Sequence, residues 1–487
     1  MTSPTRRVLA LAPMPPEKSA YALARYSRSP DSIEDSLRWV HGHSSEKFWE
    51  QFYFDYGHAS IADLGHVIIC FEGISELAAI YIEDEALWDG QAKSSRYQDF
   101  GPGGVFVPEH VQGTPMEATY RGIAARLQQA YTTLHAPIKD YLTSTTPKPD
   151  DMKPAAYDRT MNARTFDVTR YLLPLAATTN VGQVVSIRTL EKQISRLLSL
   201  PMAELRAIGE DLKRACANPP LNLWGELNGQ SAAPNEPLAP TLARHARPCE
   251  YLIKTYQDLK QAAAERLRLG EVKESEPVEL IEPHAPLDEL AATLLYRVAV
   301  YPYRQILAVV REWTEKEKED LIEIALRRRG PHDELLQEFR CGYGFIFDIL
   351  MDLGGWRDLH RHRRCQQIRQ EFTTIHGYET PALLKDAGIA AEYRAVMDEV
   401  KEQVEGLTLS HADVATYVTP FGFRVRCLFK MDYAEAEYIA RLRSGVKGHF
   451  SYRTIAWLMQ RAVLARYPAL GTRIAATPPD IEDSLTR

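Results

Sequence analysis

The chain has 487 residues, of which 45% are hydrophobic and 25% charged, and its formal net charge is −7. This length accommodates two or three domains, and the composition is that of a soluble globular protein, without an apolar run near the ~18 residues of a membrane span. The acidic balance argues against a general nucleic-acid-binding protein, which would carry a basic face.

The six cysteines are scattered and form no Cys-x-x-Cys pair. This usage argues against a disulfide framework and against a structural zinc site. Residues 1–7 also lack the long apolar segment of a signal peptide. We therefore expect a cytoplasmic protein without a metal centre.

The predicted elements occur twice along the chain, with a period of about 270 residues. Each series begins with a short apolar strand ending in proline, Val8–Pro13 in the first and Val278–Pro283 in the second. Three further pairs of segments match, namely apolar helices at Glu72–Ile80 and Phe345–Leu353, polar segments at Ser95–Phe100 and Ile368–Phe372, and the proline-ended segments Tyr171–Pro174 and Tyr417–Pro420.

Other elements follow from periodicity. His66–Phe71 is a candidate buried strand, and Arg424–Met431 alternates charged and apolar residues as a half-exposed strand does. Gly229–Pro240 is typical of a linker, and the charged run Glu315–Asp320 of a solvated helix start. Helices are predicted at Tyr251–Leu269, Ala434–Ser444 and Tyr452–Tyr467.

The predicted fold class is α+β, with two tandem copies of an antiparallel sheet flanked by helices. We place the first copy at residues 1–225, the linker and connecting helix at 226–275, and the second copy at 276–487. No Gly-x-Gly-x-x-Gly follows a strand, so a Rossmann dinucleotide domain and a P-loop are both disfavoured.

The densest group of basic residues is His360–Arg364, with two histidines and three arginines. Arginine offers a planar, permanently charged fork that matches phosphate oxygens. If Arg361-His362-Arg363 is extended, both arginines face one side; if it is helical, they point in different directions. A solvated basic turn is the alternative interpretation.

The first copy contains weaker signals. Ser94 and Arg96 would point the same way in an extended segment and together hold one phosphate, whereas the alternative is a polar loop. Gly57-His-Ala-Ser60 offers backbone N–H groups, a hydroxyl and an imidazole, or simply a helix cap at Ser60. Of Arg441 and Arg443, placed on one helix, only one should face a site.

Together these motifs resemble the flavin-dependent thymidylate synthases, whose hallmark combines Arg-His-Arg with Ser-x-Arg-Tyr, a preceding Gly-His-x-Ser and a later Arg-x-x-Leu-Pro. The first copy has Gly57–Ser60, Ser94–Tyr97 and Arg170–Pro174, and the second has Arg361–Arg363 and Ala440–Arg443. The resemblance implies reductive methylation of dUMP, or of a related uridine nucleotide, with FAD, NADPH and methylenetetrahydrofolate.

Neither copy holds the whole motif. The first has the acidic Tyr81–Ala86 in place of Arg-His-Arg, and the second has Thr416 where the first has Arg170. Because the losses are complementary, we predict one composite site built from both copies. In the family, sites form between subunits of a homotetramer, so a fused chain is expected to form a homodimer that imitates that tetramer.

The resemblance assigns roles to individual residues. Arg443 would face the uracil as the catalytic group, while the remaining candidates bind ligands. FAD would be held by Arg361, His362, Arg363, Ser27, Ser60 and His58, and the nucleotide by Ser94, Arg96, Arg170 and Gln91.

Two other interpretations stay open. One is a non-catalytic descendant that binds a nucleotide or flavin or scaffolds an assembly, and the other is a methyltransferase without flavin. The Lys447–Arg453 segment holds polar groups that either line a pocket or cap a helix. Cys365 is expected to pack in the interior rather than to react.

Overall fold

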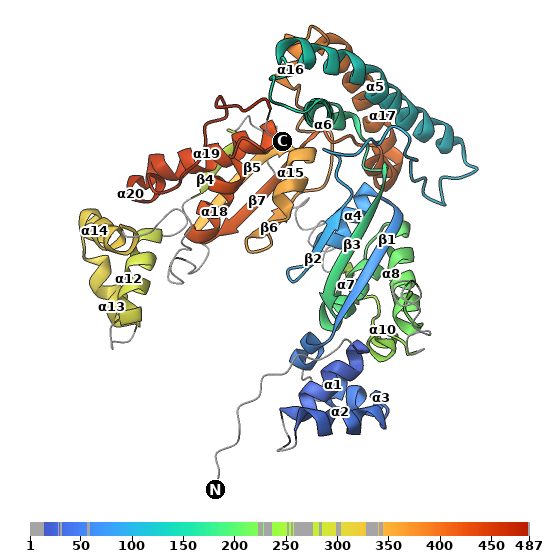
Figure 1. Ribbon diagram of the computed structural model, residues 1–487, viewed down its shortest axis with the longest axis vertical. Helices are drawn as coiled ribbons and strands as arrows, with labels where there is room; N and C mark the ends of the chain where they lie inside the picture. Colours follow the sequence, from blue (N-terminus) through green and yellow to red (C-terminus); the bar gives the residue numbers. More distant parts are fainter. Residues whose placement is uncertain are drawn as a thin grey trace. The chain divides into compact units, whose positions relative to one another are not determined.

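The computed structural model describes residues 14–27, 29, 32–55, 59–222, 227, 236–250, 253–254, 257, 276–281, 285–298, 303–327, 339 and 344–485. The fold is mixed α+β with two sheets and many helices, as predicted (Figure 1). The predicted connecting helix Tyr251–Leu269 and most of the linker Gly229–Pro240 lie outside the described residues. None of the described helices is long and apolar enough to span a membrane.

The chain forms two compact units. Unit 1 comprises Met1–Ile74, Ala78–Ala92 and Thr179–Leu269, and unit 2 comprises Ser75–Leu77, Lys93–Thr178 and Gly270–Arg487. Unit 2 therefore combines a large segment of the first copy with the whole of the second.

Unit 1 is built on a three-stranded sheet of order β1-β3-β2, in which β2 pairs antiparallel with β3. The strands are β1 (His66–Ser75), β2 (Asp89–Ala92) and β3 (Thr178–Ser186). The helices are α1 (Pro16–Tyr26), α2 (Ile33–His41), α3 (Glu46–Phe48), the π-helix η1 (Trp49–Asp55), the 3₁₀ helix η2 (Ala59–Leu64), α4 (Glu76–Glu83), α7 (Ile187–Leu198), α8 (Ala203–Ala217) and α10 (Pro240–His245).

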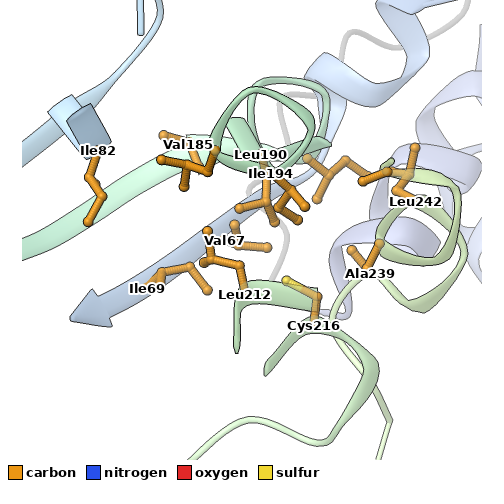
Figure 2. Packing of buried hydrophobic residues seen from close by; sticks show 14 of the residues in the cluster. Val67, Ile69, Ile82, Val185, Leu190, Ile194, Leu212, Cys216, Ala239 and Leu242 are labelled. Carbon is orange, nitrogen blue, oxygen red and sulfur yellow. The ribbon is translucent and has the colours of Figure 1, made fainter. Parts of the chain in front are cut away.

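One face of this sheet carries the core of unit 1 (Figure 2). Val67 and Ile69 of β1 and Val185 of β3 pack against Leu190 and Ile194 of α7. Because side chains alternate along a strand, the intervening residues of β1 face outward, and Ile68 is 73% exposed. The prediction of a fully buried strand at His66–Phe71 was therefore wrong, although the strand itself is present.

Unit 2 is built on a four-stranded antiparallel sheet of order β4-β5-β7-β6. Its strands are β4 (Val278–Ile281), β5 (Phe345–Asp352), β6 (Gln366–Arg369) and β7 (Arg424–Met431). Its helices are α5 (Pro115–Thr145), α6 (Pro154–Thr169), the 3₁₀ helix η3 (Arg170–Leu172), α12 (Pro286–Val298), α13 (Tyr303–Arg311), α14 (Glu315–Leu326), α15 (Leu353–His360), α16 (Ala382–Asp386), α17 (Ala390–Tyr417), α18 (Tyr433–Arg443), α19 (Phe450–Arg466) and α20 (Pro468–Gly471).

Several predicted elements of unit 2 are confirmed. The strand at Val278, the alternating strand Arg424–Met431 and the helices near Ala434–Ser444 and Tyr452–Tyr467 are β4, β7, α18 and α19. The charged run Glu315–Asp320 begins α14, where Thr314 and Glu317 form a capping box. Helix α19 packs against β4 and β5 (Figure 1).

The predicted helix Phe345–Leu353 was wrong, because this segment is strand β5. Phe345, Phe347 and Ile349 are buried, while the residues between them are half-buried. The burial period is thus two, as in a strand, but Ile346 and Leu350 on the half-buried face are apolar as well and conceal it. Its first-copy match, Glu72–Ile80, is also divided, since β1 ends at Ser75 and α4 begins at Glu76.

The internal repeat is visible as a repeated order of elements. In the first copy β1 runs directly into α4 and is followed by β2, and later β3 runs directly into α7. In the second copy β5, α15, β6, β7 and α18 follow in the same order. This order makes β2 the counterpart of β6, so the predicted match of Arg96 with Arg369 was wrong, since Arg369 lies on β6 and Arg96 lies beyond β2.

The matched segments Tyr171–Pro174 and Tyr417–Pro420 contact each other in unit 2, and Pro174 forms an antiparallel bridge with Pro420. Backbone hydrogen bonds run both ways. Leu175 N–H donates to Thr419 C=O at 3.1 Å, and its counterpart Phe421 N–H donates to Leu173 C=O at 3.0 Å. Such mutual pairing is the signature of an isologous, two-fold contact, here formed within one chain.

A second pair of reciprocal bonds extends this ladder. Gly422 N–H donates to Tyr171 C=O at 2.9 Å, and Ala176 N–H donates to Tyr417 C=O at 2.6 Å. We call residues 171–177 and 417–423 the junction. A Cβ at Gly422 would lie 2.7 Å from Tyr393 Oη and 3.1 Å from Tyr171 Cδ1, so the junction requires glycine at this position.

The change Gly422→Ala should destabilise unit 2 by about 1–3 kcal/mol, because a methyl group added to a well-packed interior forces its neighbours apart. Gly406→Ala is the matched control. Its site lies on an exposed face of α17 with nothing within 4 Å, so the control should be neutral or stabilising by about 1 kcal/mol. Equal melting temperatures for the two variants by scanning calorimetry would contradict this account.

Candidate functional site

The centre of the candidate site is an ion pair between the two copies within unit 2. Arg170, in η3 directly after α6, donates from both terminal nitrogens to Asp358 Oδ2, at 3.1 and 3.2 Å. Asp358 lies in the last turn of α15. The side chain of Arg170 is only 2% exposed, whereas that of Asp358 is 20% exposed, so the carboxylate covers the guanidinium from the solvent side.

Helix α15 is held in place by contacts at its N-terminus. Asp352 caps it by accepting from Gly355 N–H at 2.6 Å, and the Asp352 carboxylate also accepts from the Ser451 hydroxyl of α19. Leu353 N–H and Gly354 N–H donate to carbonyls of the junction. Arg357 pairs with the fully buried Glu76 and lies 4.8 Å above the Phe421 ring. These contacts fix where Asp358 projects.

Four guanidinium groups act electrostatically on Asp358. Burial alone would raise the pKa of this carboxyl, but Arg170, Arg96, Arg361 and Arg443 together bring its pKa below the ordinary value. The first two arginines come from the first copy and the last two from the second. We call these four arginines with Asp358 the arginine cluster.

Arg96 enters the cluster through a second ion pair. Its Nε and one terminal nitrogen donate to the two oxygens of Asp167 at 2.6 and 3.1 Å, a bidentate arrangement. Its other terminal nitrogen donates to Tyr452 Oη at 3.0 Å. Asp167 and Arg170 lie three residues apart at the end of α6, so one helix end presents both groups.

His449 joins α6 to the start of α19. It caps α19, its Nδ1 accepting from Ser451 N–H at 3.2 Å, so its Nε2 carries the proton and donates to Asp167 C=O at 2.7 Å. The Lys447–Arg453 segment therefore both caps a helix and supplies polar groups to the cluster.

Arg443 is the last residue of α18, and its Nε donates to His362 Nε2 at 2.7 Å. Because an arginine N–H can only donate, His362 Nε2 must hold a lone pair, and Nδ1 carries the proton toward Glu435 Oε1 at 3.3 Å. The Arg443 guanidinium lies 5.5 Å from the Tyr452 ring centre. Arg441, two residues earlier on the same helix, is exposed and donates to Glu437 instead.

The pKa of His362 is lowered, first by burial and further by the nearby Arg443 and Arg363 charges, although Glu435 acts in the opposite direction. A protonated imidazole would place two positive groups against each other at the Arg443 contact. His362 is therefore a neutral acceptor that orients Arg443.

The Arg361-His362-Arg363 segment is neither extended nor helical but a turn after α15, with Arg363 N–H donating to Arg361 C=O at 3.0 Å. Arg361 and Arg363 are half-buried. Ser94 and Arg96 also lie in a turn, where Arg96 N–H donates to Ser94 Oγ at 3.3 Å, so the expected extended arrangement was wrong.

The other predicted site residues belong to unit 1. Ser27 caps the end of α1 and its hydroxyl donates to Ala24 C=O at 2.8 Å. Gln91 is exposed on β2, opposite Gly182. Ser60 lies in η2 without a described side chain, and His58 lies outside the described residues.

Cys365 has no sign of an activated thiol. It is buried, and its Sγ donates to His362 C=O at 3.0 Å. Burial raises the pKa of this thiol to about 12, so it stays protonated at neutral pH. Among the described residues, no group of His, Cys, Asp and Glu side chains is arranged to hold a metal ion.

The corresponding place in the first copy is filled by an ion pair inside unit 1. The acidic segment after α4 contributes Glu85, which contacts Arg196 of α7 at 2.8 Å. Arg196 also donates to Tyr81 C=O at 2.6 Å. Leu197 occupies the position on α7 that Arg443 occupies on α18, so the first copy offers no equivalent cation there.

Three carboxylates in or beside the cluster were not predicted, namely Asp167, Asp358 and Glu435, whereas His449 and Tyr452 lie in the Lys447–Arg453 segment that was predicted to line a pocket or cap a helix. A partial signal existed for two of them. Asp167 lies one helical turn before Arg170, and Asp358 lies one turn before Arg361, where a carboxylate can pair with the basic group.

These features define a fused pair of diverged α+β copies with a shared arginine-rich site. The family model described as Thymidylate synthase complementing protein matches residues 9–217 and 286–469. The chain thus belongs to the flavin-dependent thymidylate synthase family, and the two matched regions agree with the two copies.

Curated proteins are similar to this chain over most of its length. A UPF0159 protein of Chlamydia muridarum is 26% identical over 446 residues, covering 87% of this chain and 79% of that protein. A UPF0159 protein of Chlamydia pneumoniae is 26% identical, with 86% and 78% covered. A UPF0159 protein of Thermoplasma acidophilum is 23% identical, with 92% and 93% covered.

The lowered pKa of His362 makes a prediction about stability in mild acid. Between its folded pKa and the unfolded value of about 6.5, the unfolded chain binds more protons, so stability falls as pH falls. Its contribution is fully present above pH ~6.5. His362→Gln cannot titrate and should lose less stability between pH 7.5 and 5.5, by up to about 1.4 kcal/mol per pH unit.

Scanning calorimetry at the two pH values measures this difference. His376→Gln is the control, because His376 also has a lowered pKa but is more exposed and lies outside the cluster. It should change the pH dependence less. If His362→Gln retained the full wild-type acid sensitivity, the neutral imidazole assigned here would be wrong.

Proposed function

We propose that this chain is a fused flavin-dependent thymidylate synthase that reductively methylates dUMP, or a related uridine nucleotide, at one composite site per chain. The observation that carries the proposal is that two pairs of arginines, Arg96 with Arg170 and Arg361 with Arg443, lower the pKa of one carboxyl, Asp358, which Arg170 contacts directly. Each pair comes from a different copy, as the complementary motif losses predict.

The donor set suits a phosphate group. Arg96 contacts Asp167, Arg170 contacts Asp358, and Arg361 and Arg443 add positive charge near Asp358. Arg170 Nε is buried, and no residue in the described part of the chain accepts a hydrogen bond from it. Ser94 and Gln91 remain proposed as further nucleotide-binding residues.

FAD is supported by family membership, and we propose that Arg361, His362 and Arg363 bind it. Ser27, Ser60 and His58 belong to unit 1 and remain separately proposed as FAD-binding residues. The half-buried arginines of the turn have the chemistry to pair with its phosphates. Bound flavin supplies the hydride for the pyrimidine, while NADPH and methylenetetrahydrofolate serve as reductant and carbon donor.

Arg443 is the proposed catalytic residue. Neutral His362 fixes its Nε, so the terminal nitrogens of the guanidinium are oriented as a unit. A guanidinium held beside the uracil carbonyls stabilises negative charge that develops on the ring. Leu197 and Thr416 stand where a second site of this kind would need Arg443 and Arg170, which supports a single site.

A non-catalytic protein that binds a nucleotide or flavin is the second candidate. The internal ion pair of Arg170 with Asp358 favours this second candidate, because a carboxylate already occupies the guanidinium that we propose as a phosphate-binding group. In either case we propose a cytoplasmic homodimer, which would contain four copies in total, as in the homotetramer of the family.

The first experiment is the visible absorption spectrum of the purified protein, followed by denaturation and identification of any released chromophore. Released FAD and oxidation of the reduced flavin that depends on dUMP and methylenetetrahydrofolate are the expected results. A colourless protein that takes up no added FAD would contradict the proposal. Bound FAD without nucleotide-dependent oxidation would favour the second candidate.

Arg443→Met should then lower the rate of nucleotide-dependent flavin oxidation by about 10²–10³-fold, the usual effect of removing one donor that stabilises developing charge. Arg441→Met is the matched control, because Arg441 lies on the same helix but is exposed and donates to Glu437 of its own helix. An equal loss in both variants would remove Arg443 from the proposed chemistry.

A further inference from the structure

The position of Asp358 points to a property of the arginine cluster beyond its ability to bind an anion. The carboxylate presents one oxygen to both terminal nitrogens of Arg170, at 3.1 and 3.2 Å. A fork-to-fork pair would use both carboxylate oxygens. The contact between Asp358 and Arg170 therefore uses only part of the donor capacity of this arginine, and Arg170 Nε stays without a partner.

Arg96 provides an internal comparison. It is also a buried arginine paired with an aspartate. Its two hydrogen bonds to Asp167 go to different carboxylate oxygens, at 2.6 and 3.1 Å. Asp167 is 2% exposed, whereas Asp358 is 20% exposed. Asp167 is thus enclosed in the interior, whereas the Asp358 carboxylate is partly exposed to solvent.

A buried arginine without any counter-charge is strongly unfavourable, so Arg170 needs an anion in every state of the protein. Asp358 supplies it in this structure. A phosphate dianion brings three acceptor oxygens and more charge to the same place. A phosphate that pairs with the same edge of the Arg170 guanidinium, between its two terminal nitrogens, has to take the place of the carboxylate there.

We propose that Asp358 is an internal competitor for the phosphate of the ligand, which binds by displacing this carboxylate from Arg170. The inference rests on the proposed function in placing a phosphate at Arg170. The exchange keeps Arg170 paired throughout, and it lowers the affinity of the cluster for any anion too small or too weakly charged to replace the carboxylate. Asp358 is a specificity-determining residue in this scheme.

Asp358→Asn tests the proposal with inorganic pyrophosphate as the probe and isothermal titration calorimetry as the measurement. The variant removes the competing charge and keeps a polar side chain of the same size. Pyrophosphate should bind at least about tenfold more tightly, which corresponds to about 1.4 kcal/mol. Unchanged or weaker binding would overturn the proposal.

Two controls separate competition from a general change of charge. Asp348→Asn removes a carboxylate of similar exposure, paired with Arg426 at 2.7 Å on the sheet, outside the cluster. Glu435→Gln removes a charge close to the cluster, but Glu435 contacts His362 rather than Arg170. Both should change pyrophosphate affinity by less than about twofold. A tenfold gain in either control would show that local charge, not displacement, explains the result.

A crystal structure of the wild-type protein with pyrophosphate provides a test that does not depend on a folded variant. The ligand is expected on Arg170, with Asp358 turned away beyond hydrogen-bond distance. Pyrophosphate bound elsewhere, or bound while the Asp358–Arg170 contact persists, would contradict displacement. Failure of the protein to bind pyrophosphate at millimolar concentration would do the same.

The outcomes distinguish this inference from the proposed function. If Asp358→Asn binds pyrophosphate more tightly but the protein never binds FAD, the result would support the exchange and contradict the proposed synthase activity. If the wild type shows nucleotide-dependent flavin oxidation but the variant has an unchanged pyrophosphate affinity, the result would support the synthase activity and contradict the displacement of Asp358.

Discussion

The reciprocal backbone pairing at the junction is the interaction on which the candidate site depends. Residues 171–177 and 417–423 bond each other in both directions, and the start of α15 bonds the second of these segments through Leu353 and Gly354. Arg170 stands directly before the first segment, and Asp358 projects from α15. The ladder therefore brings an arginine of one copy against a carboxylate of the other, using backbone groups that do not depend on side-chain identity.

Charge balance then organises the side chains around that contact. Asp167 and Asp358 each neutralise an arginine, and His362 remains neutral so that it accepts from Arg443 instead of repelling it. Buried charges are tolerated only when they are paired, so the network is stable as a whole and sensitive to the loss of any member.

The repeat, the strand β7 and the helices α18 and α19 followed from the sequence because their residues alternate or recur with clear periods. The strand β5 did not, since Phe345–Asp352 is apolar on both faces and its period is hidden. Arg96, Arg170, Arg361 and Arg443 could be named from motifs, but Asp358 and Asp167 could not. Their importance arises from contacts across long sequence separations, and local patterns carry no information about those.

The ion pair of Glu85 with Arg196 shows what joining two copies into one polypeptide permits. In an assembly of identical subunits, every substitution is repeated at each equivalent position, so a change that ruins one pocket ruins them all. Here the acidic residue is present in one half alone, while the other half keeps His362 and Arg443. Covalent fusion therefore releases each half from the requirement of symmetry. The corresponding region of the other half can then diverge without altering the residues of the first.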